Sequence, residues 1–86
     1  MTRREARKEQ LYRTWSKAES QYRAELAGLY STADAEIAAG YHRTLDKLQR
    51  IMYQAEDEFI SMVQEEAPGW SPRTEEGDWN PWRALV

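Results

Sequence analysis

The sequence has no cysteine and a single histidine, His42, among its 86 residues. Without cysteine, disulfide bonds and thiolate metal sites are excluded, and the fold needs no oxidising compartment. No apolar run approaches the roughly 20 residues that a membrane-spanning helix requires. The basic N-terminal segment is followed by no apolar stretch, so no secretory signal is expected. These absences predict a soluble chain that acts in the cytoplasm, or in a virion if a virus encodes it.

Proline is absent from the first 67 residues and occurs only as Pro68, Pro72 and Pro81. Because proline breaks helix interiors, nothing before Ala67 forces a helix to stop, and most residues there favour helix. We therefore divide the chain into a helical body, residues 1–67, and an irregular Trp- and Pro-rich docking tail, residues 68–86.

The body carries one apolar stripe at helical spacing. Its members follow one another at steps of three or four: Leu11, Trp15, Ala18, Tyr22, Leu26, Leu29, Ala33, Ile37, Tyr41, Leu45, Leu48, Met52, Ala55, Phe59 and Val63. This period indicates an amphipathic helix, and no period of two indicates a strand. The fold class is therefore all-α. The body forms either an antiparallel, coiled-coil-like hairpin of two long helices or one continuous long helix.

The distribution of charge favours the hairpin. Basic residues begin the body (Arg3, Arg4, Arg7 and Lys8), and acidic residues end it (Glu56, Asp57, Glu58, Glu65 and Glu66). Both placements oppose the helix dipole, which favours acids at the N-terminus and bases at the C-terminus. Folding back at residues 31–34 would bring the two ends together and neutralise both, and pairing two long helices antiparallel in a dimer would do the same. We predict arms at 3–30 and 33–67, with Ser31 capping the second arm and Asp34 completing a weak capping box.

Two helices cannot bury all the apolar side chains of this body. Tyr12, Tyr30 and Tyr53 lie wholly or partly off the stripe, as do Ile51, Ile60 and Met62. Exposed apolar groups in such numbers favour a third surface, which the tail, a second copy or another protein would supply. The three tyrosines are therefore candidate partner-binding residues.

The tail concentrates aromatic residues among turn residues. Trp70, Trp79 and Trp82 are three of the four tryptophans, and Leu85 and Val86 end the chain. Asn80-Pro81 is typical of the start of a helical turn, which predicts a short terminal turn after it. Two interpretations stay open. The tryptophans either cover the open face of the hairpin or anchor a partner, because tryptophan is enriched at binding hot spots. All five residues are partner-binding candidates.

The sequence offers no catalytic constellation. His42 and Asp46 are four residues apart and would meet on a helix, but one histidine and one carboxylate make half a site. The Glu-x-x-His motif of carboxylate-bridged metal bundles is absent, because Ala39 stands three residues before His42. No phosphate loop, nucleophile elbow or zinc signature occurs. We expect no catalytic residue, no metal and no cofactor.

The basic cluster at the N-terminus is the one candidate site for nucleic acid. Arg3, Arg4, Arg7 and Lys8 are candidate phosphate contacts. Glu5 and Glu9 interrupt the cluster, and the whole chain carries a net charge of −3. Nucleic-acid binding is therefore disfavoured, and so is binding to a membrane surface.

The sequence predicts a non-enzymatic protein that binds other proteins. It would act as a structural or assembly component, for example a small virion or viral accessory subunit. Its helical body would pack with partner helices or with itself as an oligomer, and its tail tryptophans would anchor the partner. The alternatives are a small inhibitor whose acidic end mimics nucleic acid, and nucleic-acid binding through the basic N-terminal helix.

Overall fold

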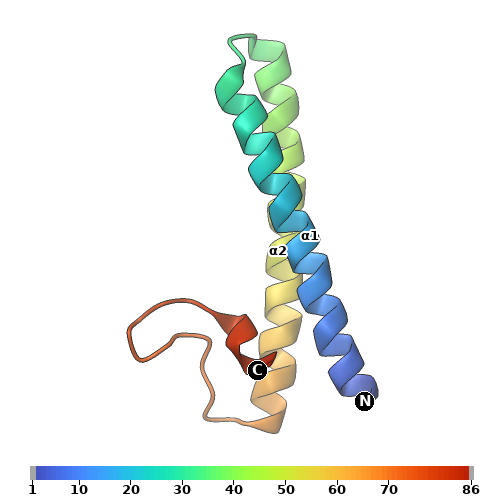
Figure 1. Cartoon of the computed structure of the whole chain (residues 1–86), viewed down its shortest axis with the longest axis vertical. Coiled ribbons are helices and arrows are strands. Elements are labelled where there is room, and N and C mark those ends of the chain that lie inside the picture. The colour runs from blue at the N-terminus through green and yellow to red at the C-terminus, as the bar shows by residue number, and fades with distance from the viewer. Residues whose placement is uncertain (1, 86) are drawn as a thin grey trace.

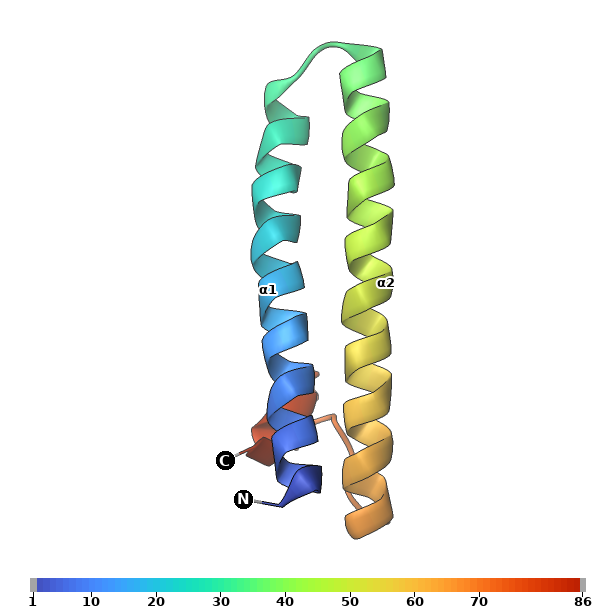
Figure 2. The same ribbon diagram turned by 90° about the vertical axis from the view of Figure 1, so that its right-hand side faces the viewer.

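The chain folds as an antiparallel hairpin of two long helices with a folded-back tail. The computed structural model describes residues 2–85. Helix α1 spans Arg3–Ser31, helix α2 spans Ala35–Glu66, and a 3-10 turn, η1, spans Pro81–Leu85. The two helices lie side by side over their whole length, and both ends of the chain lie far from the turn that joins the helices (Figures 1 and 2). The all-α hairpin is confirmed, and the single continuous helix is wrong.

The turn between the helices spans residues 32–34, within the predicted bend at 31–34, and the cap of the second helix differs from the predicted one. Ser31 is the last residue of α1, and its hydroxyl donates to the Ala27 carbonyl oxygen at 2.8 Å. Asp34 is the N-cap of α2, because its side chain accepts from the backbone N–H groups of Glu36 and Ile37 at 2.9 and 3.0 Å. The predicted role of Ser31 as cap was therefore wrong. A carboxylate serves better there, since it also opposes the positive end of the helix dipole.

The two helices pack closely near the turn, where the Tyr41 ring of α2 lies against Gly28 of α1. A Cβ atom built on Gly28 would lie 2.6 Å from the end of the Tyr41 ring on α2. A side chain at residue 28 would therefore occupy the space that the half-buried Tyr41 ring fills. The other glycine within a helix, Gly40, is open by comparison, since its nearest neighbour would be an Arg43 nitrogen at 3.9 Å.

This contrast predicts opposite outcomes for two identical substitutions. Gly40→Ala should raise the free energy of unfolding by about 0.5–1 kcal/mol, because alanine favours helix over glycine. Gly28→Ala should have a free energy of unfolding about 1–2 kcal/mol below that of Gly40→Ala, because the added methyl group displaces the Tyr41 ring. Urea unfolding followed by circular dichroism measures both values. Equal gains at the two positions would contradict the close packing of Tyr41 on Gly28.

The buried side chains lie along the predicted stripe, with exceptions near the turn. Seven of its members are buried: Leu11, Ala18, Leu45, Leu48, Ala55, Phe59 and Val63. Ala33 instead lies in the turn, and Ile37 is 53% exposed. Because α1 ends at Ser31, little of α1 remains opposite Ile37 to cover it.

The tail leaves α2 at Ala67, forms a loop, and returns to the open end of the hairpin (Figure 1). Within the loop, the Asn80 N–H donates to the Pro72 carbonyl oxygen at 2.9 Å, and Gly77 turns the chain with a φ of 88°. Arg83 ties the tail together, because its guanidinium donates to the Ser71 carbonyl oxygen and lies over the Trp70 ring, 5.2 Å from the centroid. The predicted short turn after Asn80-Pro81 is η1, which packs against both helices.

Candidate interaction surfaces

Trp82 in η1 is built into the core at the open end of the hairpin. The residue is 9% exposed and packs with Leu11, Ala55, Phe59 and Val63. Its ring centroid lies 4.6 Å from that of Phe59, 5.4 Å from Tyr12 and 5.5 Å from Trp15. Trp82 thus occupies the place of a third element against the two helices. Its predicted role in binding a partner stays a prediction, and the contacts that the structure gives it are within the chain.

The polar atom of Trp82 is left without a partner. Among the described residues, its indole Nε1 is buried and no acceptor lies within hydrogen-bonding distance. Burial of a donor without an acceptor costs free energy, so the side chain is held by its apolar contacts alone.

Three other predicted binding residues stay accessible around η1. Trp79 is 51% exposed, and Tyr12 and Leu85 are each more than a third exposed. Tyr12, Trp82 and Leu85 line one open hollow together with Asn80 and Arg83. The Arg73 guanidinium lies 5.9 Å from the Trp79 ring centroid. We call Tyr12, Trp79 and Leu85 the tail face.

The remaining predicted binding residues do not join this surface. Trp70 is partly buried against the core beneath Arg83. Tyr30 is 79% exposed at the turn end of α1, and Tyr53 is 58% exposed on α2. Val86 lies outside the described residues. The structure therefore brings together only part of the predicted set.

The basic N-terminal residues meet the acidic end of α2, as the charge argument predicts. Arg4 pairs with Glu65 at 2.5 Å and with Glu66 at 2.7 Å, and Lys8 pairs with Glu66 at 2.5 Å. Lys8 and Arg4 hold the pKa of the Glu66 carboxyl below its usual range.

A further ion pair lies one turn along the hairpin, where Arg7 meets Glu58 at 2.7 Å. Arg3 is exposed, and the described residues include no ion pair for it. Three of the four candidate phosphate contacts are thus already neutralised within the chain.

Sequence analysis missed one polar contact that links the helices and the tail. The Trp15 indole Nε1 donates to Glu56 Oε1 at 2.9 Å. Burial raises the pKa of the Glu56 carboxyl, while the Trp15 and Trp79 indoles act in the opposite direction. No local pattern indicates this contact, since Trp15 is 41 residues away in the sequence and Trp79 lies in the tail.

The Glu56 carboxylate therefore predicts a pH dependence of stability. A carboxyl whose pKa is raised by folding stabilises the fold when protonated, and this contribution is lost as the pH rises through the folded pKa. Glu56→Gln removes the charge and keeps an acceptor for Trp15. At neutral pH the variant should have the higher free energy of unfolding, by well under about 1 kcal/mol because the carboxylate is partly exposed.

The measurement is urea unfolding of both proteins at neutral pH and well below 4.5, the ordinary pKa of glutamate. The difference should vanish at the lower pH, where both side chains are neutral. Glu75→Gln, at an exposed position in the tail, is the matched control and should change little at either pH. A wild-type protein more stable than Glu56→Gln at neutral pH would show that the indole donors outweigh burial.

His42 and Asp46 are both exposed on α2. Within residues 2–85, no group of three or more histidine, cysteine, aspartate or glutamate side chains is placed to hold a metal ion. None of the described helices is long and apolar enough to cross a membrane.

The fold and its surfaces define a helical hairpin whose own C-terminal turn completes its core. Comparisons with protein-family models, with curated proteins and with solved structures found no match to this chain.

Proposed function

We propose that this chain is a non-enzymatic protein-interaction protein that anchors a protein partner on its tail face. The proposal is carried by one observation: Tyr12 and Leu85, 39% and 36% exposed, line one hollow beside Trp82, and Trp79, 51% exposed, lies just before η1 in the chain. Aromatic side chains bury much area on binding and lose little conformational entropy, which makes them the commonest binding hot spots.

The anchoring of the tail supports the proposal further. Trp82 fixes η1 in the core, and Arg83 ties η1 to the Ser71 end of the loop. The apolar residues of the tail face are thus held in place before a partner arrives. Such preorganisation lowers the entropy that association costs. Asn80 and Arg83 also line the hollow, so polar and apolar side chains meet there as they do in protein interfaces.

The alternative functions have less support. Inhibition by acidic mimicry would need free carboxylates at the end of α2, but Glu58, Glu65 and Glu66 are each paired with a cation of α1. The same pairs occupy Arg4, Arg7 and Lys8, which would have to contact phosphates in a nucleic-acid complex. Both alternatives would also require binding that weakens steeply with salt.

The test is co-purification from cells of the source organism, using the full chain with an affinity tag and identification by mass spectrometry. Trp79→Ser and Leu85→Ser should each weaken binding of the same partner about tenfold or more and lower its recovery, since truncating a hot-spot residue costs about 2 kcal/mol or more. Ile37→Ser is the matched control, because it makes the same kind of change at an exposed site far from the tail. Equal recovery from all four proteins, or capture that disappears in moderate salt, would count against the proposal.

A further inference from the structure

The contact between the tail and the two helices is almost entirely apolar. Trp82 packs into the core cluster at the open end of the hairpin, and Trp70 and Ala84 pack against that cluster. The Trp82 Nε1 atom is buried in this contact and has no acceptor among the described residues. Because burial of an unpaired donor costs free energy, the contact is weaker than a fully satisfied one of the same area.

Few polar interactions tie the tail to the helices. Within residues 2–85, none of the ion pairs joins the tail to a helix. Gln64 Nε2 lies 3.5 Å from the Trp70 carbonyl oxygen, which is beyond the usual length of a hydrogen bond. Burial raises the pKa of the Glu56 carboxyl, and the nearby Trp79 indole opposes that rise. In Figure 1 the loop between α2 and η1 stands clear of both helices.

The tail has hydrogen bonds of its own that join the two ends of its loop. The Asn80 N–H donates to the Pro72 carbonyl oxygen at 2.9 Å. The Arg83 guanidinium donates to the Ser71 carbonyl oxygen and lies over the Trp70 ring. None of these interactions uses a helix residue, so the tail keeps them when it leaves the helices.

The helices likewise have contacts with each other that do not involve the tail. At the open end, Arg4 pairs with Glu65 at 2.5 Å. Farther along the hairpin, Gln49 Nε2 donates to the Tyr22 hydroxyl at 3.2 Å, and Leu48 is buried. Removal of the tail from its position would leave each of these contacts in place.

We propose that the tail is a lid, which lifts from the hairpin while α1 and α2 stay paired. Opening brings Trp82 into water and uncovers Phe59, whose ring centroid lies 4.6 Å from that of Trp82. The tail and the hairpin each keep their own polar contacts, so opening costs less free energy than unfolding of the whole chain. Proteins commonly open in such units, each with a free energy of its own.

The lid controls the tail face, because α1 and the tail each supply part of that surface. Tyr12 comes from α1, whereas Trp79 and Leu85 come from the tail. One hollow is lined by Tyr12 together with Leu85, and a second by Glu5 and Glu9 of α1 together with Leu85. Opening separates these parts, so only the closed form carries the tail face. This consequence rests on the proposed function, whereas the opening itself does not.

The indole proton of Trp82 measures the opening, because Nε1 is buried and has no acceptor among residues 2–85. Its exchange with heavy water is followed in nitrogen-proton correlation spectra of the full chain and is corrected for the rate in free tryptophan. The corrected rate should exceed that of the backbone N–H groups of Leu45 and Leu48, in the middle of α2, about tenfold or more. Low urea should accelerate the Leu45 and Leu48 exchange steeply and the Trp82 exchange weakly, since the lid exposes less surface than unfolding does.

Two conservative substitutions separate opening of the lid from unfolding. Leu48→Val loosens the packing of the helices outside the core cluster of Trp82, so exchange of the Leu45 N–H should become several-fold faster while the Trp82 indole keeps its wild-type rate. Val63→Ala removes a member of that cluster, so exchange of the Trp82 indole should become about tenfold faster. Circular dichroism checks that both variants keep their helices.

Three outcomes would overturn the proposal. Trp82 exchange as slow as that of Leu45 and Leu48, or Trp82 exchange accelerated by Leu48→Val to the same extent, would mean that the tail leaves only when the chain unfolds. Exchange at the rate of free tryptophan would mean that the lid is never closed. Separate opening without capture of a partner would refute only the proposed function, and capture without separate opening would refute only the lid.

Discussion

Replacing Trp82 with alanine should lower the free energy of unfolding by about 3–5 kcal/mol, the usual cost of truncating a buried large aromatic side chain. The side chain packs against both helices, and no other described residue of η1 apart from Pro81 is buried with it. Small domains have only about 5–15 kcal/mol of stability in total, so this loss would remove a large share of it. Urea unfolding followed by far-ultraviolet circular dichroism measures the change.

Two control variants separate packing from the general presence of an indole in the tail. Trp79→Ala should cost less than about 1 kcal/mol, because half of that residue is exposed already. Trp82→Phe should cost much less than Trp82→Ala, since it keeps most of the apolar contact and removes an Nε1 that has no acceptor among the described residues. Similar losses for Trp79→Ala and Trp82→Ala would mean that η1 does not seal the core.

The hairpin could be predicted because the sequence features that produce it extend along the whole helical body. The apolar stripe set the helices, and the unfavourable charges at their outer ends required an antiparallel partner. The pairs of Arg4 with Glu65 and Arg7 with Glu58 are the outcome of that argument. The cap was harder to assign, because Ser31 and Asp34 are both good caps and sit three residues apart.

The position at which the tail packs on the helices could not be predicted from the local sequence pattern. Trp70, Trp79 and Trp82 have similar neighbours in the sequence, yet they are half-buried, half-exposed and buried. What distinguishes Trp82 is its contact with the core residues Leu11 and Phe59, which come together only once the hairpin has formed. The contact of Trp15 with Glu56 was missed for the same reason, because neither side chain has a local signal of the other.

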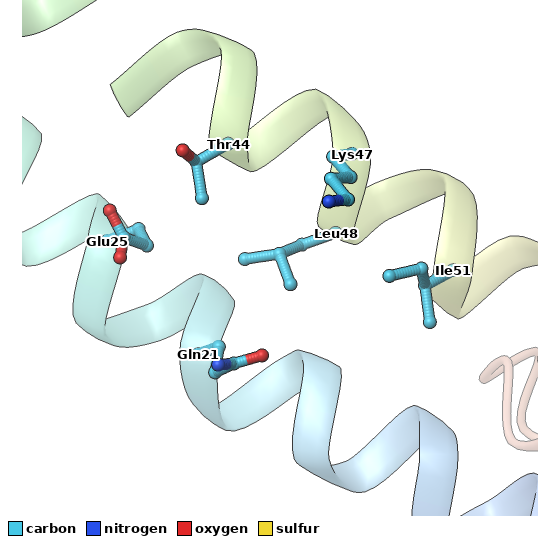
Figure 3. A pocket seen from close by; sticks show the side chains of 6 residues that line it. All are labelled: Gln21, Glu25, Thr44, Lys47, Leu48 and Ile51. Atoms are coloured by element: carbon cyan, nitrogen blue, oxygen red, sulfur yellow. The ribbon is translucent and has the colours of Figure 1, made fainter. Parts of the chain in front are cut away.

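The tail covers one face of the hairpin and leaves the opposite face open. The tail lies behind the helices in Figure 2, and on the opposite side Ile51 lines three hollows along the seam between α1 and α2, one of which Figure 3 shows.

Phe59→Ala should be the second strongly destabilising change, with a loss of about 3–5 kcal/mol in the free energy of unfolding. Phe59 is 0% exposed on α2 and lies 4.6 Å from the Trp82 ring, centroid to centroid. Because the two rings are in contact, the double variant Phe59→Ala with Trp82→Ala should lose less stability than the two single losses together, by about 0.5–1.5 kcal/mol. Ile37→Ala on the same helix, at a site 53% exposed, is the matched control and should cost less than about 1 kcal/mol. Strict additivity of the two aromatic substitutions would show that the tail packs elsewhere, and it would remove the fixed η1 on which the proposed binding surface depends.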